Sequence, residues 1–479
     1  MPGIARDRLA LRAAPAVLLA LVLGGCSALR GPQDIPEHAI PLPAEWSAEG
    51  DAVAAYDDAT YWQALGDPAL SALVEQALSQ NLDLAQSATR LIQAREALVQ
   101  ARASFLPQLN ASGGGNQGFL DGAGDPSFNL GVDASWEADL FGRIGGSARA
   151  ARFDYRAAGF SLADLRRVIA GQVATQVISA RATAQQLAIA RDTLRIQEEN
   201  LQIARWRNQA GLVSSLDVEQ ARSQRAQTAA SIPLLESNLA ATSNAISTLI
   251  GEPPGRVREL LAQAEPIPRP PALAKLSAPA DILRRRPDIR AAEASLASDT
   301  ARIGVARAQL FPLLRLTGSI GTSDGGALNL FDIVTGSVSA AISQLLFDGG
   351  RTQAQIRSAE ALADGSLAGW RKAILGALEE VETAIAARRA ADARLVELLD
   401  GVDAANNAAI LARSQYQAGL TDFQTLLNAE SQLLSARNAV IGAEADRASA
   451  FVRLTQALGG GWSGDNPADS PNSDDRTTP

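Results

Sequence analysis

Apolar and polar positions alternate strictly along residues 128–140. The even positions from Phe128 to Leu140 are all apolar, and the odd positions between them are polar or glycine. Because successive side chains of a strand point to opposite faces, this pattern predicts a β-strand with one apolar and one polar face. Its length and alternation are typical of a tilted membrane strand, with the half-buried strand of a soluble sandwich as the alternative. Three acidic side chains on the polar face favour the membrane strand.

Weaker alternation predicts three further strands, at about 105–119, 312–322 and 334–347. Four strands cannot close a membrane barrel, since the smallest known barrels have eight. An open sheet edge in lipid also leaves backbone groups unpaired, at a cost of several kcal/mol each. A membrane barrel must therefore be shared between chains, and the strand number allows either two or three copies.

Two proline-free stretches, 143–209 and 351–417, are rich in residues of high helix propensity. Each predicts a helix about 100 Å long. In the first stretch, one seven-residue ladder of leucines begins at Leu187 and one of isoleucines begins at Ile189. These ladders lie about 200° apart around the helix. A helix with apolar seams on opposite sides packs against a neighbour on each side, as in a wall of staves; an ordinary coiled-coil bundle is the alternative.

The chain is a doubled unit with an offset of about 208 residues. The landmarks that recur are Phe105 as Phe311, the run 140–143 as 346–351, and the run 209–212 as 417–420. Each half is predicted to contain a helix, two strands, a long helix and a further helix. Pro233 lies in the last helix of the first half only, where it is expected to cause a bend.

The N-terminus has the features of a secretory signal. Three arginines precede a short apolar run, and small residues lead directly to Cys26, the only cysteine. The run is too short to span a membrane. It resembles a bacterial lipobox, which implies that Cys26 starts the mature protein and carries a diacylglycerol thioether and an N-acyl chain. A lone buried thiol is the alternative. Ser27, in place of the Asp that marks inner-membrane retention in such lipoproteins, favours the outer membrane.

Charge and composition exclude several functions. The chain has a formal net charge of −9, and removal of residues 1–25, with three Arg and one Asp, leaves −11. Such a chain is a poor partner for nucleic acid, whose affinity comes from neutralised phosphates. His38 is the only histidine, so we expect no zinc site and no imidazole base. Apart from the lipid, no cofactor, no metal and no enzymatic activity are expected.

The most specific motif is PADILRRRPDIRAAE at residues 279–293, which opens the second repeat. Together with WQALGDPAL at 62–70, it makes the chain resemble the TolC-type outer-membrane factors. The similarity is strongest to the NodT-like lipoproteins that serve resistance–nodulation–division (RND) pumps, and it covers Cys26 to about Gly461.

The resemblance implies a mainly α fold with a membrane β-barrel. Three chains would form a 12-stranded barrel in the outer membrane, joined to a long α-helical barrel that extends into the periplasm. The expected organisation is a signal peptide at 1–25, a lipid-anchored N-terminus and equatorial segment at 26–70, a first repeat at 71–251, a Pro-rich equatorial connector at 252–280, a second repeat at 281–461 and a disordered tail at 462–479. The helix that ends each repeat is expected at 213–250 and at 421–458.

The function that the resemblance implies is a passive exit duct for drugs or other small toxic compounds in a tripartite efflux system. Its partners would be two further copies of the chain, outer-membrane lipid, a periplasmic adaptor protein and an inner-membrane RND transporter. A duct for type I protein secretion is one alternative, and a lipid-anchored periplasmic coiled-coil scaffold is another. A cell-wall hydrolase would need a catalytic constellation that the sequence lacks.

The resemblance also assigns candidate site residues at the turns between the helices. Gly211 and Leu212 in the first repeat, and Gly419 and Leu420 in the second, match the tips that contact the adaptor. A C-cap glycine followed by a buried leucine is the alternative. Asp422 is a candidate for an acidic ring that closes the periplasmic end, with Thr421 and Asp217 as further candidates. Each carboxylate could instead be a solvated residue at a helix start.

Overall fold

The computed structural model describes residue 46 and residues 58–117, 126–272, 285–324 and 333–469. The predicted signal peptide, Cys26, His38 and the first part of the 279–293 motif lie outside these ranges. The chain divides into two compact units, to which both repeats contribute. The strand unit contains Leu91–Ala158 and Ala291–Arg371, and the helix unit contains Leu42–Arg90, Gly159–Arg290 and Lys372–Pro479.

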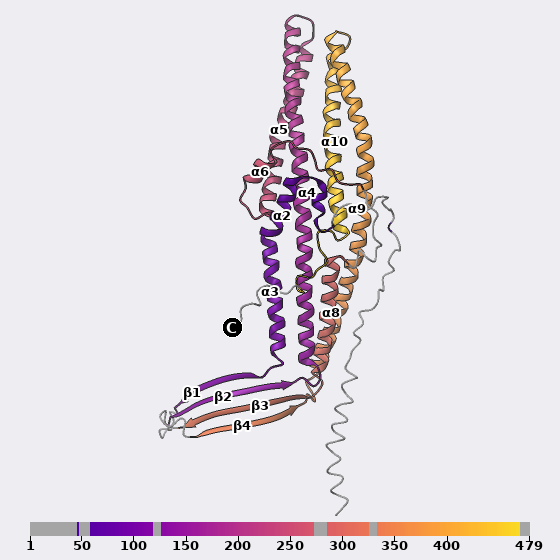
Figure 1. Ribbon diagram of the computed structural model, residues 1–479. Coiled ribbons are helices and arrows are strands. Elements are labelled where there is room, and N and C mark those ends of the chain that lie inside the picture. The colour runs from indigo at the N-terminus through magenta and orange to yellow at the C-terminus, as the bar shows by residue number, and fades with distance from the viewer. Residues whose placement is uncertain (1–45, 47–57, 118–125, 273–284, 325–332, 470–479) are drawn as a thin grey trace, which may run out of the picture. The chain divides into compact units, whose positions relative to one another are not determined.

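The two repeats run through the same elements in the same order (Figure 1). The first contains α3 (Leu82–Ala103), β1 (Gln108–Asn116), β2 (Ser127–Ala138), α4 (Arg143–Gln209) and α5 (Ser215–Leu249). The second contains α8 (Pro287–Ala308), β3 (Leu313–Asp324), β4 (Val334–Ser343), α9 (Arg351–Gln417) and α10 (Phe423–Ala457). The other elements within the described residues are η1 (Asp58–Leu65), α2 (Pro68–Gln80) and α6 (Arg256–Leu261).

Three of the strands are shorter than their sequence patterns, whereas β3 extends two residues beyond its expected end at 322. β1 begins at Gln108 rather than near 105, because Pro107 has no N–H for the ladder. β2 ends at Ala138, whose carbonyl accepts from the N–H of Leu140 in a turn. The apolar residues Leu345, Leu346 and Phe347 follow β4 without belonging to it. Apolar residues therefore continue past the last hydrogen-bonded residues of β2 and β4.

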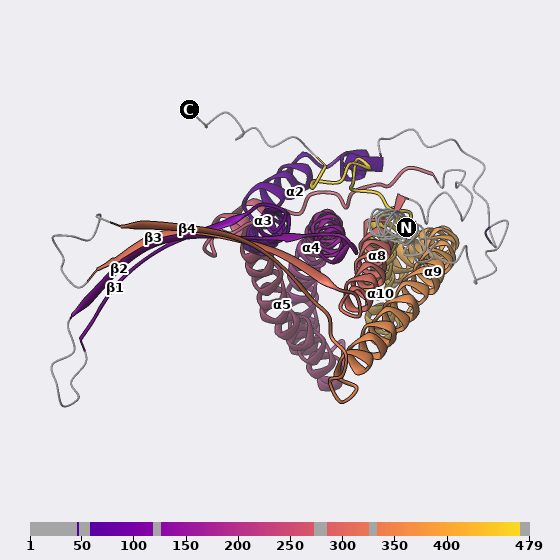
Figure 2. The ribbon, with the colours of Figure 1, turned by 90° about the horizontal axis from the view of Figure 1, so that it is seen from below.

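The four strands of the strand unit form one antiparallel sheet in the order β1-β2-β3-β4. Figure 2 shows them side by side in a single curved layer. The register keeps apolar positions together on one face and polar positions on the other. One row across the apolar face contains Leu109, Ala134, Gly318 and Val338. The neighbouring row on the polar face contains Asn110, Asp133, Ser319 and Ser337.

Hydroxyl groups connect β3 and β4 on the polar face. The Thr317 and Ser339 hydroxyls lie 2.7 Å apart, and those of Ser319 and Ser337 lie 2.8 Å apart. The apolar face is largely uncovered in the single chain, where Val338 is 91% exposed. The prediction of a two-faced sheet is confirmed by this register.

In the helix unit, α4 and α5 form one hairpin and α9 and α10 form another (Figure 1). The middle of α4 is part of the core, with Val173, Val177 and Ile178 fully buried. Pro233 lies inside α5. Within the described ranges, no helix combines the length and the apolar character needed to cross a membrane.

The segment after α10 differs from its expectation as disordered tail. Residues 462–469 are described. They pack against Gly159 and Phe160, the first residues of α4 that belong to the helix unit. Trp462 meets Phe160 edge to face at a centroid distance of 6.2 Å. Asn466 and Ala468 are buried against Gly159, where a Cβ atom would collide with both. The polar composition of the tail gave no sign of these contacts, because they depend on Trp462 and on Gly159, which is far away in the sequence.

Candidate functional site

The two helix hairpins end in the same backbone motif. Gly211 and Gly419 have φ angles of 72° and 73°, in the left-handed region that favours glycine. In each turn, the next residue donates its N–H to the carbonyl five residues earlier, Leu212 at 2.8 Å and Leu420 at 2.9 Å. Each glycine N–H donates to the carbonyl three residues earlier. This is the Schellman pattern, which satisfies the last carbonyls of a helix and reverses the chain.

Both tip leucines point into solvent, since Leu212 is 70% exposed and Leu420 is 79% exposed. The alternative in which these leucines are buried behind a C-cap glycine does not apply. Two further apolar side chains near the first turn, Trp206 and Leu216, are also exposed. These two residues were not selected from the sequence. A tryptophan among polar residues near the end of a helix, as at Trp206, could have indicated an exposed contact surface.

The gate candidates lie at the starts of α5 and α10. The Asp217 carboxylate accepts from the N–H of Ser214 at 3.1 Å, while the Ser214 hydroxyl accepts from the N–H of Asp217 at 3.3 Å. This reciprocal pair is a capping box. Asp422 caps α10 by accepting from the N–H of Thr425 at 2.7 Å. Hydrogen bonds from Thr425 lower the pKa of Asp422, so it is ionised at neutral pH. Thr421 is half-buried beside it.

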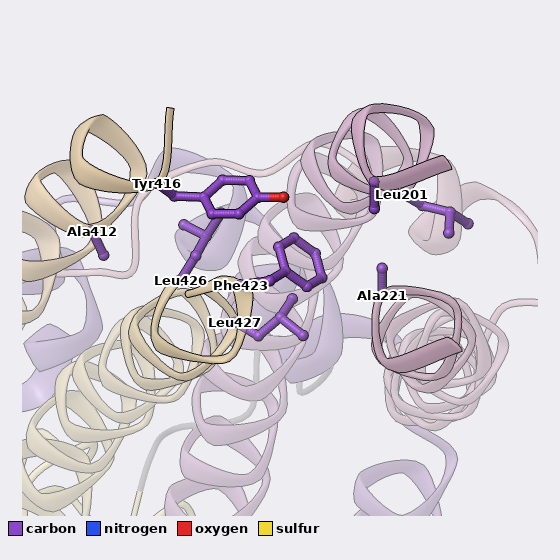
Figure 3. Close-up of a cluster of buried hydrophobic side chains, with 8 residues drawn as sticks. Leu201, Ala221, Ala412, Tyr416, Phe423, Leu426 and Leu427 are labelled. Carbon is purple, nitrogen blue, oxygen red and sulfur yellow. The ribbon is translucent and has the colours of Figure 1, made fainter. Parts of the chain in front are cut away.

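A buried apolar cluster lies next to the turns and joins all four helices (Figure 3). Its members are Leu201 and Ala204 of α4, Ala221 of α5, Ala412 and Tyr416 of α9, and Phe423, Leu426 and Leu427 of α10. The Tyr416 and Phe423 rings are 5.2 Å apart. The Arg207 guanidinium lies 4.7 Å from the centre of the Tyr416 ring and donates to the Tyr416 carbonyl at 3.3 Å. The first hairpin is thus attached to the second close to both tips.

A buried carboxylate of α10, that of Glu430, makes a further contact between the two hairpins. Glu430 is 8% exposed and accepts from Asn200 of α4 at 3.0 and 2.8 Å. It also accepts from Arg413 of α9 at 2.8 Å. The sequence reasoning did not select these residues. The sequence did contain one indication of a buried acid: Glu430 lies between Leu426 and Leu433, which belong to an apolar ladder of this helix.

The described part of the 279–293 motif, residues 285–293, forms a joint around Arg286, which is 1% exposed. Its guanidinium makes two hydrogen bonds to Asp288, at 3.0 and 2.6 Å, and donates to the last carbonyl of α10, that of Ala457, at 2.9 Å. Glu380 of α9 lies 2.8 Å away. Burial alone would raise the pKa of Asp288, but the hydrogen bonds and charge of Arg286 outweigh it, so the pKa is lowered. The motif therefore holds the start of α8 to α9 and α10.

The 62–70 motif forms a second joint. Asp67 caps α2 by accepting from the N–H groups of Ala69 at 2.8 Å and Leu70 at 3.0 Å. The same carboxylate accepts from Arg181, a fully buried residue of α4, at 3.3 Å. Both sequence motifs thus have structural roles. In the part of the chain that the structure describes, no group of three or more His, Cys, Asp or Glu side chains could hold a metal ion.

The same arrangement occurs in a solved outer-membrane channel. The channel OprN superposes on 90% of this chain and 99% of its own, with a TM-score of 0.80 and 32% sequence identity. The class of protein is therefore an outer-membrane channel.

Relatives and a family model define the family. The model described as "Outer membrane efflux protein" matches residues 73–252 and 278–460. Nodulation protein T of Rhizobium leguminosarum bv. trifolii is 33% identical and aligns with 92% of this chain and 96% of its own. The pyoverdine export outer membrane protein OpmQ of Pseudomonas aeruginosa is 31% identical over 93% and 96%. The chain belongs to the outer membrane efflux protein family, and the resemblance seen at residues 279–293 is confirmed.

Proposed function

We propose that three copies of this chain form the passive exit duct of a tripartite RND-type pump, which carries small toxic compounds across the outer membrane. Its partners would be a periplasmic adaptor and an inner-membrane RND transporter. Relatives named for the export of pyoverdine and of toluene support small molecules as the cargo. We propose no catalytic activity and no cofactor, because transport would be driven by the inner-membrane partner.

The observation that carries this proposal is the two-faced, four-stranded sheet. Its apolar face is exposed in the single chain, and its polar rows contain hydroxyls, amides and Asp133. These two faces suit lipid on the outside and water on the inside. β1 and β4 are the outer strands of this sheet, and an edge in lipid needs a partner. Three copies supply twelve strands, the number that the family resemblance implies.

The helix unit supports a shared wall as well. On α4, two members of the leucine ladder, Leu187 and Leu201, are buried, with 5% and 7% exposed, and Leu194 between them is half-buried. The isoleucine ladder remains more open, with Ile203 38% exposed. A second copy packed along the isoleucine ladder would bury this second seam.

The helix tips are the proposed contact with the adaptor, through Gly211, Leu212, Gly419 and Leu420. Schellman turns that present exposed leucines provide small apolar contacts for a helical hairpin of a partner. Asp422, Thr421 and Asp217 are proposed to line the closed periplasmic end. Cys26 is proposed to carry the lipid anchor.

A deletion strain tests this function. Loss of the gene should increase susceptibility to antibiotics or solvents, and the wild-type chain should restore resistance. The purified protein should conduct ions in planar bilayers and run as a heat-sensitive trimer in SDS. A protein that complements nothing, conducts nothing and stays soluble without detergent once its lipid is removed would contradict the proposal.

A further inference from the structure

We propose that a cavity between the two helix hairpins binds a small organic carboxylate, which holds the hairpins together. The cavity measures about 240 Å³ and lies beside the buried apolar cluster, with which it shares Tyr416 and Leu426. The binding site is independent of the proposed function, whereas the effect of the ligand on the duct rests on it.

Both hairpins contribute to the walls of this cavity. Asn200 and Arg207 come from α4 of the first hairpin, and Arg413 and Tyr416 come from α9 of the second. All four residues belong to the helix unit. A ligand that contacts both walls binds only while the hairpins are attached to each other, so its binding stabilises the attached state.

The cavity carries an excess of positive charge. The Arg413 guanidinium is paired with the Glu430 carboxylate at 2.8 Å. Within the described residues, no carboxylate forms an ion pair with Arg207, whose guanidinium lies over the Tyr416 ring and donates to the Tyr416 carbonyl. Two guanidinium groups and one carboxylate leave one positive charge without an anion. The charge therefore favours an anionic ligand, because hydrogen bonds from a guanidinium to a carboxylate are among the strong ones.

Two hydrogen-bond donors at the cavity lack an acceptor. Tyr416 is 6% exposed, and its hydroxyl has no hydrogen-bond partner among the described residues. The Nε–H of Arg413 is likewise buried and unpartnered there. The two residues are three positions apart on α9 and so lie on the same side of the helix. Figure 3 shows the Tyr416 hydroxyl directed away from α9, toward the helix that carries Leu201. A carboxylate can accept from both donors, which are costly to leave unpaired.

The remainder of the ligand is small and apolar. Ile203, which is 38% exposed, and Leu426, which is 1% exposed, provide apolar wall on the two sides of the cavity. The volume is below the roughly 300–1,000 Å³ of sites that hold drug-sized ligands. A monocarboxylate with a compact hydrocarbon group has this combination of charge and size, and benzoate is a suitable probe.

Calorimetric titration of the purified full-length protein with benzoate tests the site, with sodium chloride adjusted to keep the ionic strength constant. Binding should saturate, and Tm should rise with the benzoate concentration. Tyr416→Phe keeps the ring and removes the hydroxyl donor. It should weaken benzoate binding about tenfold or more, since a hydrogen bond to a charged group contributes at least this factor. Tyr155→Phe removes a hydroxyl from α4 outside the cavity and should bind benzoate like the wild type.

Benzamide provides a second comparison, which needs only the wild-type protein. It has nearly the shape of benzoate without the negative charge, so it should not bind measurably. Equal benzoate affinity of Tyr416→Phe and the wild type would overturn the site. So would saturable binding of benzamide as tight as that of benzoate, or the absence of benzoate binding to the wild type.

Planar bilayers test the effect on the duct. Any opening that separates the hairpins requires release of the ligand, so benzoate should lower the conductance of the wild type. The same benzoate concentration should change the conductance of Tyr416→Phe much less, relative to that variant without benzoate. Undiminished wild-type conductance at saturating benzoate would show that the ligand does not hold the duct closed. A wild-type protein that fails to conduct even without benzoate would instead contradict the proposed function, while the calorimetric test of the site would stand.

Discussion

Asn200 donates from its side-chain amide to both carboxylate oxygens of Glu430, at 3.0 and 2.8 Å, and so connects α4 to α10. Arg413 of α9 donates to the same carboxylate at 2.8 Å. One buried acid thus serves three helices from two hairpins, next to the apolar cluster around Tyr416. A buried carboxylate of this kind fixes the relative placement of the helices, because the buried Asn200 amide would be left unsatisfied without it.

Replacement of Glu430 by alanine should lower the stability of the helix unit by about 1–3 kcal/mol, because the Asn200 and Arg413 donors lose a buried acceptor. Thermal unfolding of the purified protein, followed by helical circular dichroism, measures this loss. Glu430→Gln keeps one acceptor in place and serves as the control, with a smaller decrease in Tm. Equal Tm values for wild type and Glu430→Ala would show that the carboxylate does not hold the helices.

Stability should depend on pH through Asp288. Its pKa in the folded protein is lowered, so the folded state favours the carboxylate over the protonated acid. The contribution is fully present above the ordinary aspartate value of about 3.9 and is lost as the pH falls through the lower, folded value. Arg286 remains charged throughout this range.

The measurement is Tm between neutral pH and pH 3 for the wild type and for Asp288→Asn. The asparagine variant should be less stable at neutral pH, and the difference should shrink as the solution becomes acidic. A difference in Tm that stays constant with pH would mean that the Arg286–Asp288 ion pair contributes no charge-dependent stability.

Substitution of both tip leucines by glutamate should abolish efflux without affecting the channel itself. Leu212 and Leu420 are exposed, so their replacement costs little folding free energy. Expression, trimer formation and bilayer conductance should match the wild type, while resistance falls to that of the deletion strain. Leu234→Glu alters a similarly exposed leucine of α5, 62% exposed and away from the turns, and should keep full resistance. Full resistance in the tip variant would remove these leucines from the adaptor contact.

Asp422→Asn separates two roles of one side chain. Asparagine caps a helix about as well as aspartate, so the hydrogen bond to the N–H of Thr425 and the Tm should be maintained. The charge is lost, and an acidic ring at the closed end would then favour cations less. Reversal potentials in asymmetric salt measure this selectivity. Unchanged cation selectivity in the asparagine variant would leave Asp422 with capping alone.

The long-range order of the elements was accessible from the sequence, because it depends on local patterns. The absence of proline from Arg143 to Gln209 predicted α4 in full, and the recurrence of Gln-Ala-Gly-Leu predicted the second turn. The alternation from Phe128 predicted a two-faced strand, although the strand ends before the alternation does.

The side-chain attachments were less accessible, because they join residues far apart in the chain. Nothing near Arg286 in sequence indicates that it reaches the carbonyl of Ala457. Asn200 and Glu430 likewise meet only after both hairpins have formed. The apolar contact of Trp462 with Phe160 was missed for the same reason, since the surrounding composition is polar.

The uncovered sheet has a consequence for biogenesis. A newly exported chain carries an apolar surface that includes Val338 and two strand edges that can pair with any other chain. Exposed edges of this kind promote aggregation. A chain whose apolar face and outer strands stay uncovered is therefore expected to aggregate, so the yield of folded protein should fall when the chain is produced faster than other copies can cover these surfaces.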